Sequence, residues 1–478
     1  MRNKAKIAII GGGVAGSTTA LHLGQLGLDI TLFEKEDHIS SGPPYCHLHA
    51  GGNLYPDISD TQCITLLKQS IDFVRYFPFV VDYRPTVIAL PVRYKETPTD
   101  LIPRLELLTK EYESLIKKDK ANEVLGKSEN YYTLYEREAL EALKKSPSVQ
   151  EPKTFDEWMI PVVQNIDLDK VQFPLILVQE YGLNLFRFGS GLELALKNLD
   201  SVKLSTRTAI EHITKEKNGW KISSTHNSKK NEMHFDYLIN ATGFRTGTID
   251  DMVGVSTERM VEFKASYISQ WKEKETTLFP EIIFHGERGT PEGMGQFTPY
   301  PGGYFQLHGM TDDITLYKDG LSNSTPSSAQ PKLESHFLEK LDQKWQEKEI
   351  NKRTESAIEH LGKFIPAFKQ ATVASKPLFG AQQIPGTDPT LRVAEVSFPT
   401  ERYARCEIVK VSSALDMVDA ITKDLVTLGY LKEEVLKQRD LNYLKDLKEK
   451  EIHHHAQESA QKRAYPTGLA RRNVALSK

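Results

Sequence analysis

Cysteine is scarce in this sequence of 478 residues, which contains only Cys46, Cys63 and Cys406. Such an odd and sparse set argues against a disulfide framework and fits a reducing compartment, so we expect a cytoplasmic protein. No run of about 18 consecutive apolar residues occurs, so no membrane-spanning helix is predicted. The formal net charge of -3 provides no overall basic field, so nucleic acid is not an expected partner.

The N-terminus combines basic residues with an apolar run that breaks into glycines after Ile10. This run is too short for a signal peptide and is interpreted as a buried strand over 6–10. A helix over 14–25 and a second strand over 29–33 are expected to follow. This β-α-β order predicts a parallel sheet in an α/β protein, and the chain length predicts two or three domains.

The stretch "IAIIGGGVAGSTTA" has the G-x-G-x-x-G spacing of a dinucleotide-binding turn at Gly11, Gly13 and Gly16. In such a turn the glycines permit a tight bend, close approach to a pyrophosphate and close packing of helix on strand. Glu34 ends the second strand, where a carboxylate accepts hydrogen bonds from ribose hydroxyls. The predicted cofactor-binding residues of this unit are Gly11, Gly13, Val14, Ala15, Gly16, Glu34 and Lys35.

A second segment, "YLINATGFRTG", places Ala241, Thr242 and Gly243 after an expected strand. Together the two segments resemble the two-part FAD site of the D-amino-acid-oxidase-like flavoprotein superfamily. The resemblance implies FAD and an α/β fold with an α+β part, in which a Rossmann-like FAD-binding domain carries a second, mixed-sheet substrate domain. The implied divisions are 1–78, 185–250 and 372–430 for FAD, 79–184 and 251–371 for substrate, and 431–478 as a charged helical tail.

Further segments resemble the branch of malate:quinone oxidoreductases and L-2-hydroxyglutarate dehydrogenases. "CHLHAGGNLYP" is similar to that branch's H-A-G-x-x-Y loop at His49, Ala50, Gly51 and Tyr55, with one extra residue before the tyrosine. The resemblance implies dehydrogenation of a small 2-hydroxy acid by hydride transfer to flavin N5, with a quinone or another electron acceptor. Two alternatives stay open: an amine or amino-acid oxidase, and a non-catalytic flavoprotein with a role in assembly or sensing.

Oxidation of a hydroxy acid needs a base for the hydroxyl proton and a cation for the carboxylate. Histidine suits the base because its pKa lies near neutrality, so His49 is the first candidate and His47 the second. The alternative is that these histidines only bind the backbone of a glycine-rich loop. No metal is expected, because Cys46, His47 and His49 have no second ligand cluster and a zinc site needs about four ligands.

Two departures from the family pattern concern positive charge. Gly380 is followed by Ala381 rather than by the family's substrate-binding arginine, and the glycine-rich turn before the last helix is missing. Arg402 and Arg405 are the candidates to supply that charge. The loop "GQFTPYPGGYFQLHGM" provides further substrate candidates in Tyr300, Tyr304 and His308, with packing at a sheet edge as the alternative.

The C-terminal region is very polar. The adjacent histidines of "EIHHHAQ" face different directions on a helix, so a solvated helix is expected rather than a metal site. The basic segment 462–478 is predicted to be a charged disordered tail. Contact of this segment with anionic lipid, which would make the protein peripheral to the inner face of a membrane, is the open alternative.

Overall fold

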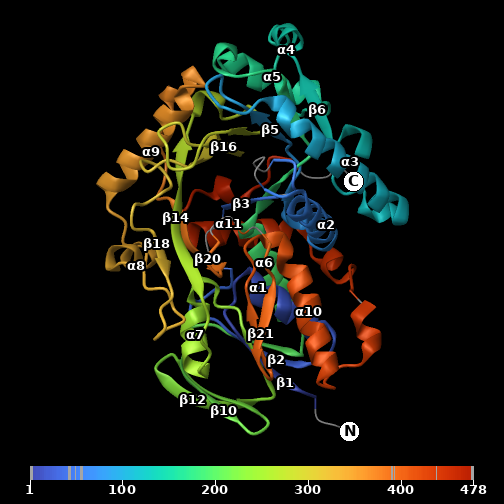
Figure 1. The fold of residues 1–478 in the computed structure, drawn as a ribbon, viewed down its shortest axis with the longest axis vertical. Coiled ribbons are helices and arrows are strands. Elements are labelled where there is room, and N and C mark those ends of the chain that lie inside the picture. Colours follow the sequence, from blue (N-terminus) through green and yellow to red (C-terminus); the bar gives the residue numbers. More distant parts are fainter. Residues whose placement is uncertain are drawn as a thin grey trace.

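A computed structural model describes residues 4–40, 45–48, 50–53, 58–388, 391, 393–437 and 439–474. The fold is mixed α/β, and the described residues form four sheets and eleven α-helices (Figure 1). His49, one of the predicted catalytic residues, lies outside the described residues. His47 lies in a described strand, but nothing is described of its side chain.

The first sheet has six strands in the order β21-β22-β13-β1-β2-β9. All neighbours are parallel except β21 and β22, which run antiparallel. Helix α1 (Val14–Gln25) joins β1 to β2, so the predicted strand, helix and strand at the N-terminus are confirmed. The strands are β1 (Lys6–Ile10), β2 (Asp29–Phe33), β9 (Val202–Ser205), β13 (Tyr237–Asn240), β21 (Val396–Thr400) and β22 (Tyr403–Cys406).

Alternate residues of β1 enter two different cores. Ile7 and Ile9 belong to a core with α1 and with the helices α2 (Asp60–Tyr76), α6 (Leu185–Lys197) and α10 (Ala414–Thr427). Ala8 and Ile10 face a second core that includes β11 and α7 (Thr246–Val253). Because both faces are covered, β1 is apolar throughout its buried length, as expected for a central parallel strand.

Strand β11 is the middle strand of an antiparallel sheet of β10 (Thr208–Glu216), β11 (Gly219–His226) and β12 (Lys229–Phe235). A short sheet of β3 (Tyr45–His47), β8 (Gly182–Asn184) and β4 (Val81–Asp82) ties the histidine-containing segment to the start of α6. Helix α3 (Ile102–Lys118) packs its buried face into the same core as α2.

The second large sheet has the order β18-β14-β17-β16-β15-β5-β7-β6, with β19 and β20 also pairing with β14. Strand β14 (Arg259–Gln270) runs along much of the molecule's length, and β20 (Leu378–Pro385) pairs beside it (Figure 1). The other strands are β5 (Thr86–Ala89), β6 (Tyr132–Tyr135), β7 (Leu175–Val178), β15 (Glu281–Phe284), β16 (Gly295–Tyr300), β17 (Tyr304–Gly309), β18 (Leu321–Asn323) and β19 (Thr372–Val373).

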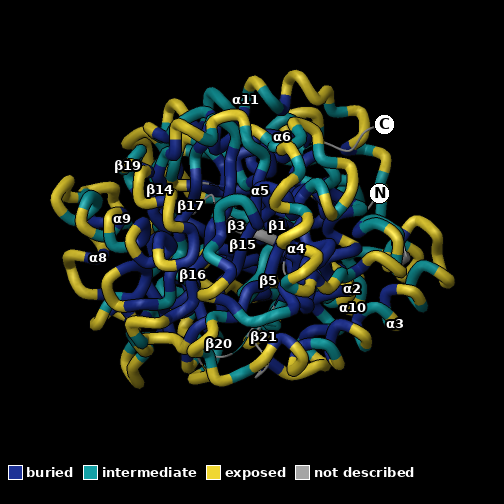
Figure 2. Tube along the Cα trace, turned by 90° about the horizontal axis from the view of Figure 1, so that it is seen from above, coloured by how far each residue is buried: buried dark blue, intermediate teal, exposed yellow. Residues whose placement is uncertain are grey.

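Helices at the periphery complete the fold. Helices α5 (Phe155–Asn165) and α9 (Glu347–Gly362) bury apolar residues against the second large sheet. Figure 2 shows buried chain gathered in the interior and exposed chain along α3, α8 (Ser335–Leu341) and parts of α9. Helix α4 (Arg137–Leu143) packs on α5. Within the described part of the chain, no helix combines the length and the apolar character needed to cross a bilayer.

The C-terminal region differs from its sequence-based prediction. Helix α11 (Glu449–Lys462) packs on α6 and buries Ile452, Ala456 and Ala460. Beyond it, Leu469 is only 2% exposed. The predicted helix is confirmed, but one of its faces is buried rather than solvated, and the expectation of a disordered segment is wrong for 462–474. The missed signal is the four-residue spacing of Ile452, Ala456 and Ala460, which forms an apolar stripe within a polar sequence.

Candidate functional site

A cavity of about 590 Å³ begins where strands of the six-stranded sheet end. Ile10, Phe33 and Ala241, at or just beyond the carboxyl ends of β1, β2 and β13, all line it. Ligands of open α/β sheets bind at this edge, and the volume is typical of a cofactor site. We call the lining residues within 10–15, 33–36 and 241–243 the nucleotide end. The lining residues within 379–383 and 408–411, together with 463 and 465, form the far end.

Two glycines are required by the turn between β1 and α1. Gly11 has a φ of +100°, and a Cβ there would lie 2.5 Å from the carbonyl oxygen of Ala241. A Cβ on Gly16 would lie 1.8 Å from the carbonyl oxygen of Gly11. Any side chain at either position would collide with backbone, so the helix packs this closely on the strand only with glycine.

Gly13 has a different role, because nothing lies within 4 Å of the position that its Cβ would occupy. It precedes the first turn of α1, whose free N–H groups and positive dipole end favour an anionic ligand. The open space at Gly13 is what a closely approaching pyrophosphate requires. The residues of this turn therefore fit a bound dinucleotide.

Glu34 is 5% exposed and bridges two loops of the nucleotide end. Its Oε2 accepts a hydrogen bond of 2.7 Å from the Gly12 N–H, and its Oε1 accepts one of 2.9 Å from the Glu36 N–H. Burial raises the pKa of Glu34, whereas these two hydrogen bonds act in the opposite direction. Each carboxylate oxygen has further lone pairs, so Glu34 can still accept ribose hydroxyls. Lys35, beside it, also lines the cavity.

The turn after β13 is held by a buried network. The Asn240 amide donates to the Tyr403 hydroxyl at 2.8 Å, and Asn240 Oδ1 accepts the Thr242 hydroxyl at 2.7 Å. The Tyr403 hydroxyl in turn donates to Asp250 at 2.6 Å. Ala241, Thr242 and Gly243 all line the cavity. The two segments recognised in the sequence therefore meet at one end of one cavity.

The far end of the cavity is built from parts of the chain that are distant in sequence. Strand β20 contributes Phe379 through Gln383, and the segment before α10 contributes Lys410. Arg463 and Tyr465 come from the C-terminal region beyond α11. Lys410 directly precedes a 3-10 turn, Val411–Ser413, that continues into α10, so its charge adds to the positive end of that helix.

Residues 6–143 match the model of a protein family described as DAO, FAD dependent oxidoreductase. The match covers under a third of the chain, and it supports an FAD-dependent oxidoreductase whose N-terminal part is similar to this family. FAD is the dinucleotide that the open space at Gly13, the N-terminus of α1 and Glu34 fit. No curated protein matches the sequence.

Solved structures of similar fold extend over most of this FAD-dependent oxidoreductase. The glycerol-3-phosphate dehydrogenase of Bacillus halodurans, complexed with FAD, has a TM-score of 0.55 and 11% identity, and the match covers 96% of this chain and 73% of that one. L-α-glycerophosphate oxidase from Mycoplasma pneumoniae, with FAD bound, has a TM-score of 0.56, 14% identity and coverages of 88% and 94%. L-proline dehydrogenase from P. horikoshii has a TM-score of 0.53 and 16% identity, and the match covers 90% of this chain and 100% of that one. These TM-scores, at such low identities, show a shared fold.

Arg405 does not supply positive charge to the cavity of this oxidoreductase. It is 5% exposed and donates to Asp250 at 2.9 Å and to Glu407 at 2.8 Å. Arg402 lies in the turn between β21 and β22 with its side chain 3.3 Å from the Glu401 carboxylate. Neither residue lines the cavity, which corrects the sequence-based expectation. Lys410 and Arg463 are the cations at the far end, and the sequence analysis missed both.

The predicted substrate residues of β16 and β17 lie outside the cavity lining. Tyr300 packs in the same cluster as Tyr465, and its hydroxyl donates to Gln306 at 3.1 Å. Tyr304 also packs against that cluster. The His308 ring lies 3.1 Å from the Ser266 hydroxyl on β14. These side chains form a layer behind Tyr465, which itself lines the cavity.

The histidine loop can be followed on both sides of position 49. The Leu48 N–H donates to the Tyr181 carbonyl at 2.9 Å. The Gly52 N–H donates to the buried carboxylate of Glu180 at 2.6 Å, and the Tyr131 hydroxyl donates to the same carboxylate at 3.0 Å. Burial raises the pKa of Glu180 from 4.5 to about 7. The loop is therefore fixed to the chain that enters β8 and α6.

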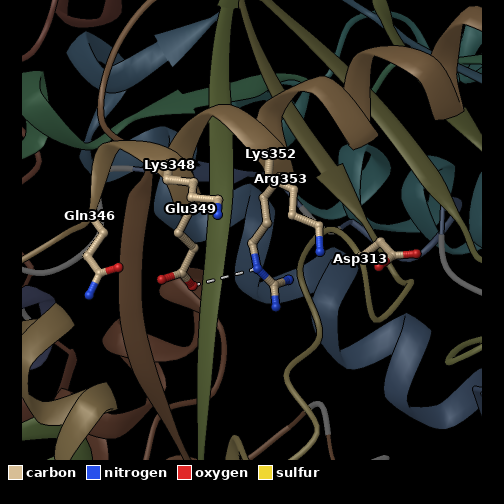
Figure 3. Close-up of a pocket in the computed structure, with 6 residues that line it drawn as sticks. All are labelled: Asp313, Gln346, Lys348, Glu349, Lys352 and Arg353. Carbon is tan, nitrogen blue, oxygen red and sulfur yellow. Dashed lines mark ion pairs between the residues drawn. The ribbon is translucent and has the colours of Figure 1, made fainter.

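A second cavity, of about 290 Å³, lies on α9 and carries no comparable features (Figure 3). Arg353 lies beside Glu349, with 3.7 Å between Nε and the carboxylate, and its Nη1 donates to the carbonyl oxygen of Ile314 at 2.7 Å. Lys348 and Lys352 are exposed. The contact between Arg353 and Ile314 holds α9 to the loop that contains Ile314. Among the described residues, no group of three or more His, Cys, Asp and Glu side chains could hold a metal ion.

Proposed function

We propose that this FAD-dependent oxidoreductase dehydrogenates a small 2-hydroxy acid. One observation carries the proposal: a single cavity joins the nucleotide end to a far end where Lys410 and Arg463 are positively charged. A carboxylate substrate would be attracted to such an end, and FAD would be held at the other. Because the two ends belong to one cavity, a substrate at the far end would share that cavity with FAD.

The chemistry divides between cofactor and chain. Bound FAD supplies the hydride acceptor, flavin N5, for the hydrogen on the carbinol carbon. The chain must hold the carboxylate with a cation and remove the hydroxyl proton with a base. Lys410 and the adjoining N-terminus of α10 favour negative charge at the far end. We propose a quinone or another acceptor for the second half of the cycle.

His49 remains the proposed base, with His47 as second candidate. Support comes from the chain around them: the Ser40 N–H donates to the Gly12 carbonyl at 2.8 Å, so this segment leaves the glycine-rich turn directly. Strand β3 then pairs with β8, which leads into α6. Phe186 on α6 contacts the ring of Tyr465. Strand β3 is thus connected through β8 and α6 to Phe186, which contacts Tyr465 at the far end.

Oxidation of an amine or amino acid is the second candidate function. The similar structures include L-proline dehydrogenase from P. horikoshii and glycine oxidase from Geobacillus kaustophilus, whose names indicate amino acids. A cationic far end suits the carboxylate of an amino acid equally well. The two candidates differ in the atom that loses a proton, which is a hydroxyl oxygen in one and a nitrogen in the other.

Anaerobic mixing of the FAD-bound protein with matched donors tests the proposal. A panel should pair each 2-hydroxy acid with the amino acid of the same carbon skeleton, and glycerol-3-phosphate should be included. We expect loss of the flavin absorbance with a 2-hydroxy acid and not with its amino-acid counterpart. Bleaching by amino acids alone would transfer the proposal to the second candidate, and bleaching by no donor would favour a non-catalytic flavoprotein.

The base is tested by His49→Ala. This variant should keep FAD, since position 49 lies outside the G-x-G-x-x-G turn of the sequence, and should lose reduction by the donor found above. Reduction at an unchanged rate would show that His49 is not the base, and His47→Ala would then be the decisive variant. FAD content and melting temperature, measured on the same preparations, separate loss of the base from loss of the fold.

A further inference from the structure

Arg463 and Tyr465 lie where the C-terminal region closes the far end of the cavity. Tyr465 is 7% exposed, and its hydroxyl donates to the Pro377 carbonyl, just before β20, at 2.8 Å. The Tyr465 ring contacts the Phe186 ring at a centroid distance of 5.9 Å. The segment after α11 is therefore held by these contacts between the start of α6 and the start of β20.

The guanidinium of Arg463 is held against these two rings. Its Cζ lies 5.0 Å from the Phe186 ring centroid and 5.8 Å from that of Tyr465. Aromatic faces attract a cation, and their rigid position limits the orientations of the side chain. Burial lowers the pKa of Arg463, so the site places its charge in a poorly solvated environment. A charge placed there interacts strongly with an anion, because water screens it less.

A second cation, Lys376, also lies against the Tyr465 ring. The Lys376 ammonium is 4.7 Å from the Tyr465 ring centroid and donates to Gln343 Oε1 at 2.6 Å. Gln343 lines the cavity, so Lys376 stands one residue behind the lining. Burial and the Arg463 charge both lower the pKa of Lys376. Within the described ranges Lys376 forms no ion pair with a carboxylate. At this end, Asp342 is the carboxylate among the described lining residues, and it is exposed.

Strand β20, next to this pair, lines the cavity without a cation. Gly380 and Ala381 of β20 line the cavity, and β20 offers Gln382 and Gln383 rather than arginine. Gln382 accepts a hydrogen bond from Lys264 at 3.1 Å, and Gln383 accepts one from the Thr246 hydroxyl at 2.9 Å. These amides are thus engaged with protein groups, and β20 itself brings no positive charge to the far end.

We propose that Arg463, from the C-terminal segment, binds the carboxylate of the substrate, and that Lys376 behind Tyr465 strengthens the site as a second positive charge. The proposal rests on the proposed function for the identity of the anion. Arg463 is suited to this role because its planar fork of N–H groups matches a carboxylate. The C-terminal segment is accordingly part of the active site.

Binding of an anion that cannot be oxidised tests the assignment without catalysis. Propionate has a carboxylate but no hydroxyl, and its binding to the FAD-bound protein can be followed by calorimetry and by the shift of flavin absorbance. We expect Arg463→Met to weaken propionate binding by about 10- to 100-fold, the range for loss of a charged hydrogen-bond partner. Methionine keeps apolar contact with the two rings, so the melting temperature should change little.

Three companion variants sharpen the result. Arg463→Lys should recover part of the affinity, because charge is kept while the fork is lost. Lys376→Met should weaken binding by only about 3- to 10-fold, because its charge acts at greater distance. Arg402→Gln is the matched control, since Arg402 lies outside the cavity, and it should bind propionate as the unmodified protein does. Equal propionate affinity in Arg463→Met and the unmodified protein would overturn the proposal.

The outcomes also separate this proposal from the proposed function. If Arg463→Met loses propionate but no 2-hydroxy acid reduces the unmodified protein, the anion site stands and the proposed function fails. If a 2-hydroxy acid reduces both proteins with the same KM, the function stands and the assignment of Arg463 fails. If inorganic phosphate binds through Arg463 and propionate does not, the carboxylate assignment is overturned in favour of a phosphate group.

Discussion

The nucleotide end of the cavity is formed largely by backbone within short stretches of sequence, whereas the far end is formed by side chains from distant parts of the chain. Gly11, Gly13 and Gly16 lie within six residues and act by having no side chain. Arg463 and Lys410 instead contribute charged side chains, and they come from different parts of the chain. The first end can be recognised from a motif, and the second is assembled only by the tertiary fold.

The largest effect is expected from Gly13→Glu, which changes only the nucleotide end of the cavity. Because nothing lies within 4 Å of the Gly13 Cβ position, the side chain fits but places a carboxylate where the pyrophosphate binds. We expect less than about a tenth of the normal FAD content, by absorbance, in a protein that still folds. Gly13→Ala is the graded control and should lose less. Normal FAD content in Gly13→Glu would show that the pyrophosphate of FAD does not bind at this turn.

Asp250→Ala should destabilise the support of the nucleotide end. Asp250 accepts the Tyr403 hydroxyl and lies 2.9 Å from Arg405 and 3.2 Å from Arg259. Removing it leaves two buried guanidinium groups without this partner, so the free energy of unfolding should fall by about 3–5 kcal/mol. Urea denaturation measures this, and the exposed neighbour Asp251→Ala should cost no more than about 1.5 kcal/mol. Equal effects of the two variants would contradict the network.

Leu469→Ala distinguishes a packed C-terminal region, as the structure has it, from the disordered tail that the sequence predicted. With Leu469 only 2% exposed, the substitution should lower the free energy of unfolding by about 2–4 kcal/mol. A disordered tail would give no change. Leu338 on α8 is 40% exposed and serves as control, with an expected loss below about 1 kcal/mol. Denaturation curves of the FAD-bound proteins would decide between these outcomes.

Glu180 gives a pH-dependent effect near the histidine loop. The folded protein keeps the Glu180 proton up to its pKa of about 7, whereas the unfolded chain releases it near 4.5. This contribution to stability is therefore present below about pH 4.5 and is lost as pH rises to about 7, by roughly 3 kcal/mol. Glu180→Gln should flatten the change in melting temperature across that window. An unchanged slope, as expected for the exposed control Glu355→Gln, would contradict a proton on Glu180.

The smallest effect is expected at the cavity on α9. Lys352 is exposed at that cavity, so Lys352→Ala should change the free energy of unfolding by less than about 0.5 kcal/mol. FAD content and reduction by donors should match those of the unmodified protein. A change in either would show that α9 communicates with the cofactor cavity and would weaken the division into two ends.

How much could be predicted from the sequence follows from the same contrast. The bounds of β1, α1 and β2 were predicted correctly because glycine spacing and apolar runs are local signals. The positive charge was assigned to Arg402 and Arg405 because they precede α10 in sequence. Burial of Asp250 instead draws Arg405 away from the cavity, and no local pattern reveals a pairing across 155 positions.

The C-terminal region failed to be predicted for a related reason. The prediction was based on its polar composition and overlooked the three apolar positions of α11 that are buried. In "KRAYP", Tyr465 directly precedes Pro466 and Arg463 lies two positions before Tyr465, a combination that a solvated tail does not need. Only the packing of α11 on α6 brings that short sequence to the cavity.

The place of Arg463 in the chain also has a consequence for biosynthesis. The groups that close the far end are translated more than four hundred residues after the glycine-rich turn. A chain interrupted after α10 would contain every residue of the nucleotide end and still lack one wall of the cavity. Such a product should take up cofactor yet leave it open to water and oxygen. The wall formed by Arg463 and Tyr465 is therefore added only after every other described part of the cavity lining has been translated.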